Sequence, residues 1–289
     1  MNSIRKLSTV VFLIVCVLTG FIYFYYNKIS SYKNVTLKIG LLPYKGIEQL
    51  INVNTPLLKH VTDEVGVSYQ LIIPESYEEM LAMFSGKELD LALLGGHVFL
   101  KAHHDDGAKA MVISDLDMKN RTYFISRNIG QNMTIESFKG KKFCFGDQMS
   151  TSGHLMPRMY LGEKEIIPES YYASVEYSGS HDRSVEWVLD GRADLCAVHG
   201  NVVDSMMAYG AISSKDLSII WESPTYHDNV WVAQAGMSSK LFSSIKKAFI
   251  NMSHANEMHK SALNKLGIKR YVAVDIGNYK SLSEASIGF

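Results

Sequence analysis

Four short polar clusters in the chain contain the residue types that bind small anions. Serine and threonine hydroxyls donate hydrogen bonds, and glycine lets the backbone approach a ligand closely. The clusters are Leu42-Pro43-Tyr44, Leu94-Gly95-Gly96-His97, Ser150-Thr151-Ser152-Gly153-His154 and Ser178-Gly179-Ser180-His181-Asp182. Three adjacent hydroxyls, at Ser150, Thr151 and Ser152, could surround one tetrahedral anion. Such clusters also cap helices without binding anything, but their recurrence at corresponding places favours an anion site.

Each cluster lies between a predicted strand and a predicted helix. The apolar patterns predict strands at 35–42, 67–73, 89–94, 142–145, 173–177 and 193–198. Helical spacing follows between them, at 47–65 with an interruption near Pro56, behind a capping box at Ser76 and Glu79, and from about 153 and 182. This alternation predicts parallel sheets with helices on both faces.

Two such units with extra strands between them predict two α/β lobes. The additional strand-like runs are at 110–114, 122–126, 217–221 and 229–233. Strands at these places are expected where the chain crosses from one lobe to the other and returns. Ligands of such sheets lie at the carboxyl ends of strands, against helix N-termini whose dipole favours an anion. The four clusters occupy these positions, so Tyr44 and Gly95 join the hydroxyl residues as candidate ligand contacts.

The N-terminal segment predicts a membrane anchor. Residues 7–27 contain no charged side chain, and about 20 apolar residues span a bilayer core. Arg5 and Lys6 precede the segment, which favours a cytoplasmic N-terminus. A cleaved signal peptide is an alternative, although no A-x-A pattern follows, and a lipoprotein would use Cys16. All three interpretations place residues 33–289 outside the cytoplasmic membrane, most simply in a bacterial periplasm.

The charge balance excludes some function classes. The 289 residues carry 29 basic and 29 acidic side chains, whereas a nucleic-acid-binding protein needs a basic face. Residues 1–32 hold three basic side chains and no acid, which leaves 26 basic against 29 acidic groups in the remainder. An anion bound there cannot rely on bulk electrostatic attraction. Its binding must come from a local group of hydroxyls, histidine and helix N-termini.

An ordered set of motifs resembles the periplasmic phosphonate/phosphite/phosphate-binding proteins of ABC transporters. The set covers roughly residues 35–270 and comprises Tyr77 after P-E-S, D-L-A-L-L-G-G at 90–96, G-D-x-x-S-T-S-G at 146–153, S-H-D at 180–182 with G-R-A-D at 191–194, and I-I-W-E-S-P at 219–224. The resemblance implies the type II periplasmic-binding-protein fold, with two α/β lobes joined by a two-strand hinge. The lobes are expected at 33–118 plus 222–289 and at 119–221.

The resemblance also implies which residues hold the ligand. The family's oxyanion contacts correspond to Tyr77, Ser150, Thr151, Ser152 and His181. Aminophosphonate binders of the family add two carboxylates that hold the ligand's ammonium, and a second tyrosine. These three positions correspond here to Asn201, to Asp228 and to Leu94. The oxyanion half of the site is thus retained and the amino half is lost, which favours phosphate, phosphite or an uncharged alkylphosphonate.

The expected function is therefore capture of a phosphorus oxyanion for an ABC permease. A membrane-tethered sensor that reports to a signalling protein is the alternative, because a diffusible receptor is usually cleaved or lipidated. A hydrolase is not favoured, since no G-x-S-x-G elbow occurs.

We expect no cofactor and no metal, because the His103-His104-Asp105-Asp106 run is typical of a solvated helix end. His199 and His227 lie near the inferred cleft, where a structural role is the commoner one. Cys144 and Cys196 are expected in core strands of one lobe, either as buried thiols or as a disulfide.

Overall fold

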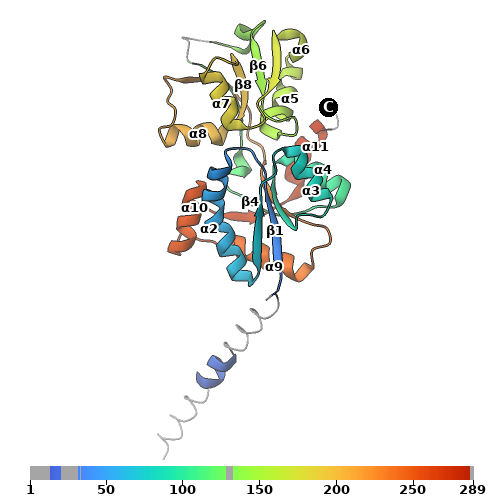
Figure 1. The fold of residues 1–289 in the computed structure, drawn as a ribbon, viewed down its shortest axis with the longest axis vertical. Coiled ribbons are helices and arrows are strands. Elements are labelled where there is room, and N and C mark those ends of the chain that lie inside the picture. The colour runs from blue at the N-terminus through green and yellow to red at the C-terminus, as the bar shows by residue number, and fades with distance from the viewer. Residues whose placement is uncertain (1–13, 21–31, 33, 128–132, 287–289) are drawn as a thin grey trace, which may run out of the picture.

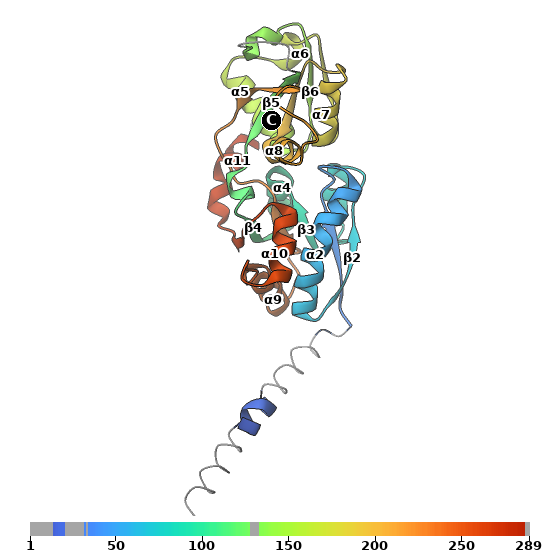
Figure 2. The ribbon, with the colours of Figure 1, turned by 90° about the vertical axis from the view of Figure 1, so that its left-hand side faces the viewer.

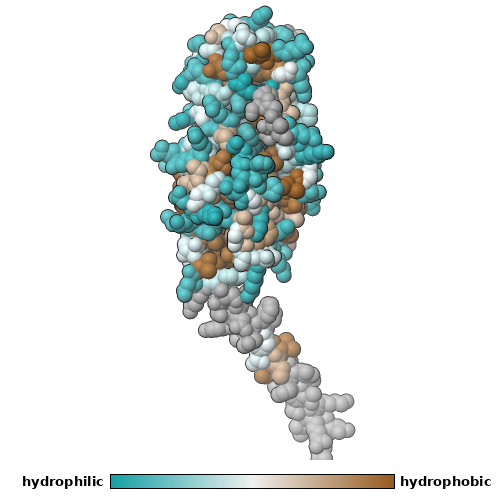
Figure 3. Space-filling view, turned by 90° about the vertical axis from the view of Figure 1, so that its right-hand side faces the viewer, coloured by the Kyte–Doolittle hydropathy of each residue, from teal (hydrophilic) through white to brown (hydrophobic). Residues whose placement is uncertain are grey.

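The computed structural model describes residues 14–20, 32, 34–127 and 133–286. Two lobes lie one above the other along the longest axis of the molecule (Figure 1). Each lobe is built around one twisted sheet with helices on both faces. The surface in Figure 3 is mostly hydrophilic, with small separate apolar patches. The large apolar side chains of the lobes are instead gathered in four buried clusters.

The first lobe contains a six-stranded sheet. Its order is β2-β1-β3-β10-β4-β11, with strands Ser68–Ile72, Thr36–Leu41, Leu91–Leu94, Val230–Ala233, Lys109–Ser114 and Tyr271–Ala273. Figure 2 shows β2 at one edge. Strands β1, β2 and β3 are parallel as predicted, whereas β10 runs antiparallel to both neighbours. Strand β10 is antiparallel because the chain enters it on returning from the second lobe.

Helices cover both faces of this sheet. One face packs against α2 (Ile47–Val65), α9 (Ser239–Ile250) and α10 (Glu257–Leu266), and the other against α3 (Tyr77–Ser85), α4 (Gly96–Asp106) and α11 (Lys280–Ser286). Side chains of β1 alternate between the faces, so that Leu37, Ile39 and Leu41 join the α2 side. This two-residue period follows from the pleat of a strand.

The second lobe contains a five-stranded sheet. Its order is β7-β6-β8-β5-β9, with strands Ser174–Tyr177, Lys142–Phe145, Leu195–His199, Thr122–Arg127 and Leu217–Glu222. Helices α7 (His181–Leu189) and α8 (Gly200–Ala208) cover one face, and α5 (Met156–Glu163) and α6 (Pro168–Tyr171) the other. Cys144 and Cys196 are register partners on β6 and β8, buried as free thiols, which confirms their expected place in the core.

Two chain segments connect the lobes. The first runs from β4 to β5 and the second from β9 to β10. They meet at an isolated antiparallel bridge, in which the backbone N–H groups of Asn120 and Tyr226 each donate to the other's carbonyl at 3.0 Å. The side-chain amide of Asn120 also donates to the Tyr226 hydroxyl at 3.0 Å. The two crossing segments are therefore held together by the pair Asn120 and Tyr226.

The predicted anchor at residues 7–27 lies mostly outside the described residues. Residues 14–20 are helical and exposed, and the Val17 and Leu18 side chains are more than half exposed. No helix within the described ranges is both long and apolar enough to cross a membrane.

The predicted helix at 47–65 is confirmed, and the interruption of its apolar spacing near Pro56 does not break it. Helix α2 continues through this residue from Ile47 to Val65. Proline lacks an N–H group, so the carbonyl of Asn52 receives no intrahelical hydrogen bond from it. Burial of Leu50, Leu57 and Val61 against the sheet outweighs this loss.

Replacing Pro56 by alanine should therefore stabilise the protein. Pro56→Ala supplies the missing donor and a better helix former, and we expect a gain of about 1–3 kcal/mol in the free energy of unfolding. Urea unfolding of the full chain in detergent measures it. The control is Ile51→Ala, an exposed position of the same helix, which should change stability by less. A destabilised Pro56→Ala variant would show that the proline ring is itself needed for packing.

Candidate functional site

The loop after β6 presents three hydroxyl residues at the boundary between the lobes. Ser150, Thr151 and Ser152 open a short π-helix, Thr151–Leu155, that leads directly into α5. The Ser150 hydroxyl accepts a hydrogen bond from the Gly153 N–H at 2.9 Å. A Cβ atom at Gly153 would lie 2.9 Å from the Cα of Gly146, so only glycine permits this turn. All three hydroxyl residues are buried.

His181 faces these hydroxyls from the first turn of α7. Its Nε2 lies 3.4 Å from the Ser150 Oγ and 3.3 Å from the Ser152 Oγ. Its Nδ1 accepts from the His199 N–H at 3.3 Å, which places the proton of the neutral ring on Nε2. Burial, followed by the nearby His199, lowers the pKa of His181 to about 3. The ring is therefore a neutral hydrogen-bond donor toward the cluster.

Tyr77 approaches the same cluster from the first lobe. It is 2% exposed at the start of α3, and its hydroxyl interacts with the Ser150 side chain. Burial, together with the carboxylates of Asp147 and Asp228, raises the pKa of this hydroxyl well above its usual value. The hydroxyl thus keeps its proton. We call Tyr77, Ser150, Thr151, Ser152 and His181 the hydroxyl–histidine cluster.

Two hydrogen bonds close the lobes over this cluster. The Thr151 Oγ1 accepts from the His97 N–H, in the first turn of α4, at 3.0 Å. The His181 N–H donates to the carbonyl of Tyr44 at 3.1 Å. Both bonds join a residue of one lobe to a residue of the other. The protein is thus in a closed form, with the cluster at the contact.

Asp228 occupies the N-terminus of α4. Its Oδ1 accepts from the Gly96 N–H at 3.0 Å, and its Oδ2 accepts from the Asn120 Nδ2 at 2.7 Å. Burial raises the pKa of Asp228, and bonds from Gly96, Thr151 and Asn120 oppose that rise. The sequence predicts that the N-terminus of α4 binds an anion. In the structure, the Asp228 carboxylate already occupies this N-terminus.

The other candidate residues lie around this cluster. A Cβ atom at Gly95 would lie 3.6 Å from the Thr151 Oγ1 and 3.7 Å from the Asp228 Oδ1, which places Gly95 beside both. Leu94 is fully buried, and its side chain packs in the apolar cluster that also contains Tyr77. Tyr44 reaches the hydroxyl–histidine cluster through its backbone carbonyl. Asn201 lies apart from the cluster, on the wall of an adjacent cavity.

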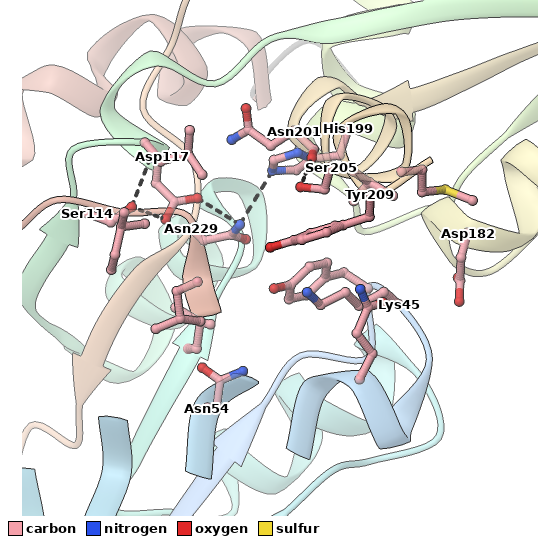
Figure 4. Close-up of a pocket in the computed structure, with 18 of the residues that line it drawn as sticks. Lys45, Asn54, Ser114, Asp117, Asp182, His199, Asn201, Ser205, Tyr209 and Asn229 are labelled. Atoms are coloured by element: carbon pink, nitrogen blue, oxygen red, sulfur yellow. Dashed lines mark hydrogen bonds between the residues drawn. The ribbon is translucent and has the colours of Figure 1, made fainter. Parts of the chain in front are cut away.

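This cavity has a volume of about 300 Å³ and lies between the lobes. Figure 4 shows Lys45, Asn54, Asp117 and Asn229 reaching it from the first lobe, opposite the β8–α8 segment of the second. That segment contributes His199, Asn201, Ser205 and Tyr209. His199 connects the cavity to the hydroxyl–histidine cluster, because its ring centroid is 5.6 Å from that of His181.

Sequence reasoning missed several residues of this region. Lys45 directly follows the Leu42-Pro43-Tyr44 cluster, so its place in the sequence could have identified it as a residue of this site. Asp117, Asn120 and Asn229 lie in the crossing segments and form no recognisable motif. His199, which the sequence placed near the cleft with a structural role as the commoner one, is 4% exposed and lines the cavity.

Metal-binding arrangements are absent from the described ranges, where no group of three or more His, Cys, Asp or Glu side chains could hold an ion. The His103–Asp106 run forms the end of α4, and Gly107 closes that helix in the left-handed conformation. The side chains of His104 and Asp105 are exposed there.

Comparisons with known proteins place the chain among transport receptors. A family model described as "ABC transporter, phosphonate, periplasmic substrate-binding protein" matches residues 39–279. A probable phosphite-binding protein of an ABC transporter from Prochlorococcus marinus is 25% identical over 261 residues, which is 86% of this chain and 88% of that protein. A phosphate-import protein from Mycolicibacterium smegmatis is 24% identical, covering 74% of this chain and 71% of that one.

The fold is shared with a solved structure of such a receptor. The P. marinus protein PhnD1 in complex with methylphosphonate superposes with a TM-score of 0.82, at 23% identity, covering 88% of this chain and 97% of that one. The predicted two-lobed periplasmic-binding-protein fold is therefore confirmed.

The buried carboxyl of Asp117 generates a prediction about pH. Burial, with the nearby Asp228 adding to it, raises its pKa from 3.8 to about 7, although Ser114 and Asn229 donate hydrogen bonds to it. The folded state therefore holds this proton more tightly than the unfolded state. The resulting stability is complete below about pH 4 and is lost as the pH rises through 7.

We expect Asp117→Asn to remove this dependence. Between pH 5 and pH 8, the free energy of unfolding should fall by about 2–3 kcal/mol more in the unmodified protein than in the variant. Urea unfolding across this range measures the difference, and Asp63→Asn, at an exposed carboxyl, should leave the pH profile unchanged. Parallel profiles for Asp117→Asn and the unmodified protein would show that Asp117 is ionised throughout.

Proposed function

The chain belongs to the family of periplasmic phosphonate-binding proteins of ABC transporters, and from this membership we propose that it captures a phosphorus oxyanion between its lobes. The family supplies the substrate-binding component of ABC uptake and works outside the cytoplasm. The observation that carries the choice of ligand is the buried hydroxyl–histidine cluster at the contact between the lobes. Four of its members, Tyr77, Ser150, Ser152 and His181, bring uncharged donor groups to this contact.

The chemistry of this cluster suits a tetrahedral oxyanion. The Tyr77 hydroxyl, the Ser150 and Ser152 hydroxyls and the His181 Nε2–H can each donate a hydrogen bond. Hydrogen bonds to an ionised acceptor are roughly twice as strong as those between neutral groups. Since no lysine or arginine belongs to the cluster, such bonds supply the binding energy. This agrees with the slight acidic excess of the chain outside its first 32 residues.

The same arrangement explains how binding closes the protein. Tyr77 belongs to the first lobe, and Ser150, Ser152 and His181 belong to the second. An anion that accepts hydrogen bonds from both lobes binds the closed form more tightly than the open form and so shifts the population toward it. We infer that 33–118 plus 222–289 and 119–221 move as two bodies about the Asn120–Tyr226 bridge.

Phosphite, phosphate and a small alkylphosphonate are the ligands that we favour. The relatives are described as a phosphite-binding protein, a phosphate importer and a methylphosphonate complex. An aminophosphonate would need a free carboxylate for its ammonium, because a buried unpaired charge is costly. Asn201 is neutral, and both oxygens of Asp228 already accept hydrogen bonds. No feature of the site favours a sensor over a transport component.

We also propose that residues 7–27 anchor the protein to the outer face of the bacterial cytoplasmic membrane. The support is the uncharged apolar sequence with Arg5 and Lys6 in front of it. Cleavage and release into the periplasm is the alternative. Either arrangement leaves the two lobes where an ABC permease can receive the ligand.

Removal of two donors should abolish oxyanion binding. A ligand at 100 times its Kd adds about 2.7 kcal/mol of stability, which raises the Tm of a chain of this size by roughly 5–10 °C. We expect this shift with phosphite, phosphate or methylphosphonate, and its loss in a Tyr77→Phe/Ser152→Ala double variant. Neither substitution removes a helix cap. Tyr172→Phe is the control, because the buried Tyr172 hydroxyl has no hydrogen-bond partner in the part of the chain that the structure describes.

The ligand assignment fails if none of the three anions shifts the Tm of the full chain in detergent. It also fails if sulfate shifts the Tm as much as they do. A larger shift with 2-aminoethylphosphonate would overturn the interpretation of Asn201 and Asp228.

The anchor proposal has a separate test. The full chain, expressed in a bacterium, should sediment with membranes, resist a carbonate wash and keep its N-terminus by intact-mass measurement. A chain that lacks residues 1–32 behind a cleavable secretion signal should appear in the periplasmic fraction. Full-length expression that yields a periplasmic protein shortened by about 30 residues would instead establish cleavage.

A further inference from the structure

We propose that Cys144 and Cys196 are a site of oxidation, at which a disulfide forms across the sheet of the second lobe. The structure contains both residues as free thiols and so shows the reduced form of the pair. An oxidising compartment follows from the extracytoplasmic location in the proposed function, and the identity of the bound anion plays no part. The disulfide adds a covalent link inside the lobe that carries most of the hydroxyl–histidine cluster.

The pairing of strands β6 and β8 brings the two cysteines together. These strands are parallel neighbours, and Cys144 is the register partner of Cys196. Neighbouring strands lie about 4.8 Å apart, and the Cα atoms of a disulfide are usually about 4.4–6.8 Å apart. Both side chains lie on the same face of the sheet, in the buried cluster that packs against α7 and α8. The backbone therefore already holds the cysteines at a separation that a disulfide can bridge.

The two thiols also interact directly. The Cys144 Sγ donates a hydrogen bond to the Phe145 carbonyl at 3.0 Å, and the same sulfur can accept the S–H of Cys196. Burial, followed by this hydrogen bond with Cys144, raises the pKa of the Cys196 thiol well above its usual value. Both residues are fully buried. The two sulfur atoms are thus neighbours in a site that solvent does not reach.

The reaction is a thiol–disulfide exchange with a disulfide-bearing oxidant of the compartment. The thiolate of one cysteine attacks the S–S bond of the oxidant and forms a mixed disulfide, and the second cysteine then displaces the oxidant's sulfur. Two S–H bonds of the chain are lost and one S–S bond forms, while the oxidant takes up two electrons and two protons and leaves as two thiols. Because burial disfavours the reacting thiolate, the exchange takes place during folding, before α7 and α8 cover the pair.

The place of the link in the chain connects it to the anion site. The segment from Cys144 to Cys196 contains every member of the hydroxyl–histidine cluster that belongs to the second lobe, from Ser150 to His181. A disulfide stabilises mainly by restricting the unfolded chain, and a loop of about 50 residues is long enough for a large effect. We therefore expect the link to stabilise the second lobe and to leave the geometry of the cluster unchanged.

Peptide mass spectrometry of the full chain, expressed in a bacterium, tests this proposal. The chain is taken from the membrane and periplasmic fractions, alkylated with N-ethylmaleimide in denaturant without reductant, and digested with trypsin. We expect the peptides 143–158 and 193–215 to be joined and to separate only after reduction. Cys16→Ser is the control, because it removes the only other cysteine of the chain and should leave the joined pair intact. Recovery of both peptides separate and alkylated overturns the proposal.

A double-mutant cycle in the Cys16→Ser background gives a second readout. Cys144→Ala and Cys196→Ala each remove the whole link, so each should lower the Tm of the chain in detergent by roughly 10 °C. The double variant should then lower the Tm by clearly less than the sum of the two shifts. Additive shifts would instead show two independent thiols and overturn the disulfide. Oxyanion binding is measured separately, so its absence overturns the choice of ligand and does not change the result for the cysteine pair.

Discussion

An anion enclosed between two protein lobes loses its water and must regain equivalent hydrogen bonds from the protein. For the proposed oxyanion site, this constraint accounts for the arrangement of the contact between the lobes. The polar side chains there are almost completely buried, and the donors come from different lobes: Tyr77 from the first lobe, and Ser150, Ser152 and His181 from the second. Uncharged donors in a dry site interact more strongly with an anion than the same groups would in water. The site can therefore dispense with lysine and arginine.

The protonation states follow from the same burial. Burial lowers the pKa of His181 and of His199 to about 3 and raises the pKa of the Tyr77 hydroxyl well above its usual value. Each of these groups is consequently neutral at physiological pH. The His199 backbone N–H then fixes which nitrogen of His181 carries the proton. A backbone contact on β8 thus directs a donor of α7 toward the hydroxyls.

Much of the fold could be predicted from the sequence, because its strands and helices have clear apolar periods and each junction carries glycine or a capping residue. The hydroxyl residues at 150–152 were recognisable as a candidate site because they are adjacent in the sequence and open a helix. Helix α2 passes through Pro56 because tertiary burial outweighs a local preference. The residues that sequence reasoning missed have a different origin. Asn120, Asp117 and Asn229 become neighbours only when two crossing segments, about 110 residues apart, meet. Nothing in a local pattern identifies them.

Asn120 shows how the hinge and the site depend on each other. Its backbone pairs with Tyr226 and holds the two crossing segments together, while its side-chain amide donates to the carboxylate of Asp228. Asp228 in turn accepts from the Gly96 N–H and so fixes the N-terminus of α4. The next N–H of that helix, at His97, donates to Thr151 of the opposite lobe. A single chain of hydrogen bonds therefore leads from the bridge between the crossing segments to the contact that closes the lobes. The bonds at Asp228 are buried and the one between His97 and Thr151 is partly buried. A rotation of one lobe that breaks the last of these bonds therefore leaves polar groups that need new partners, from a ligand or from water.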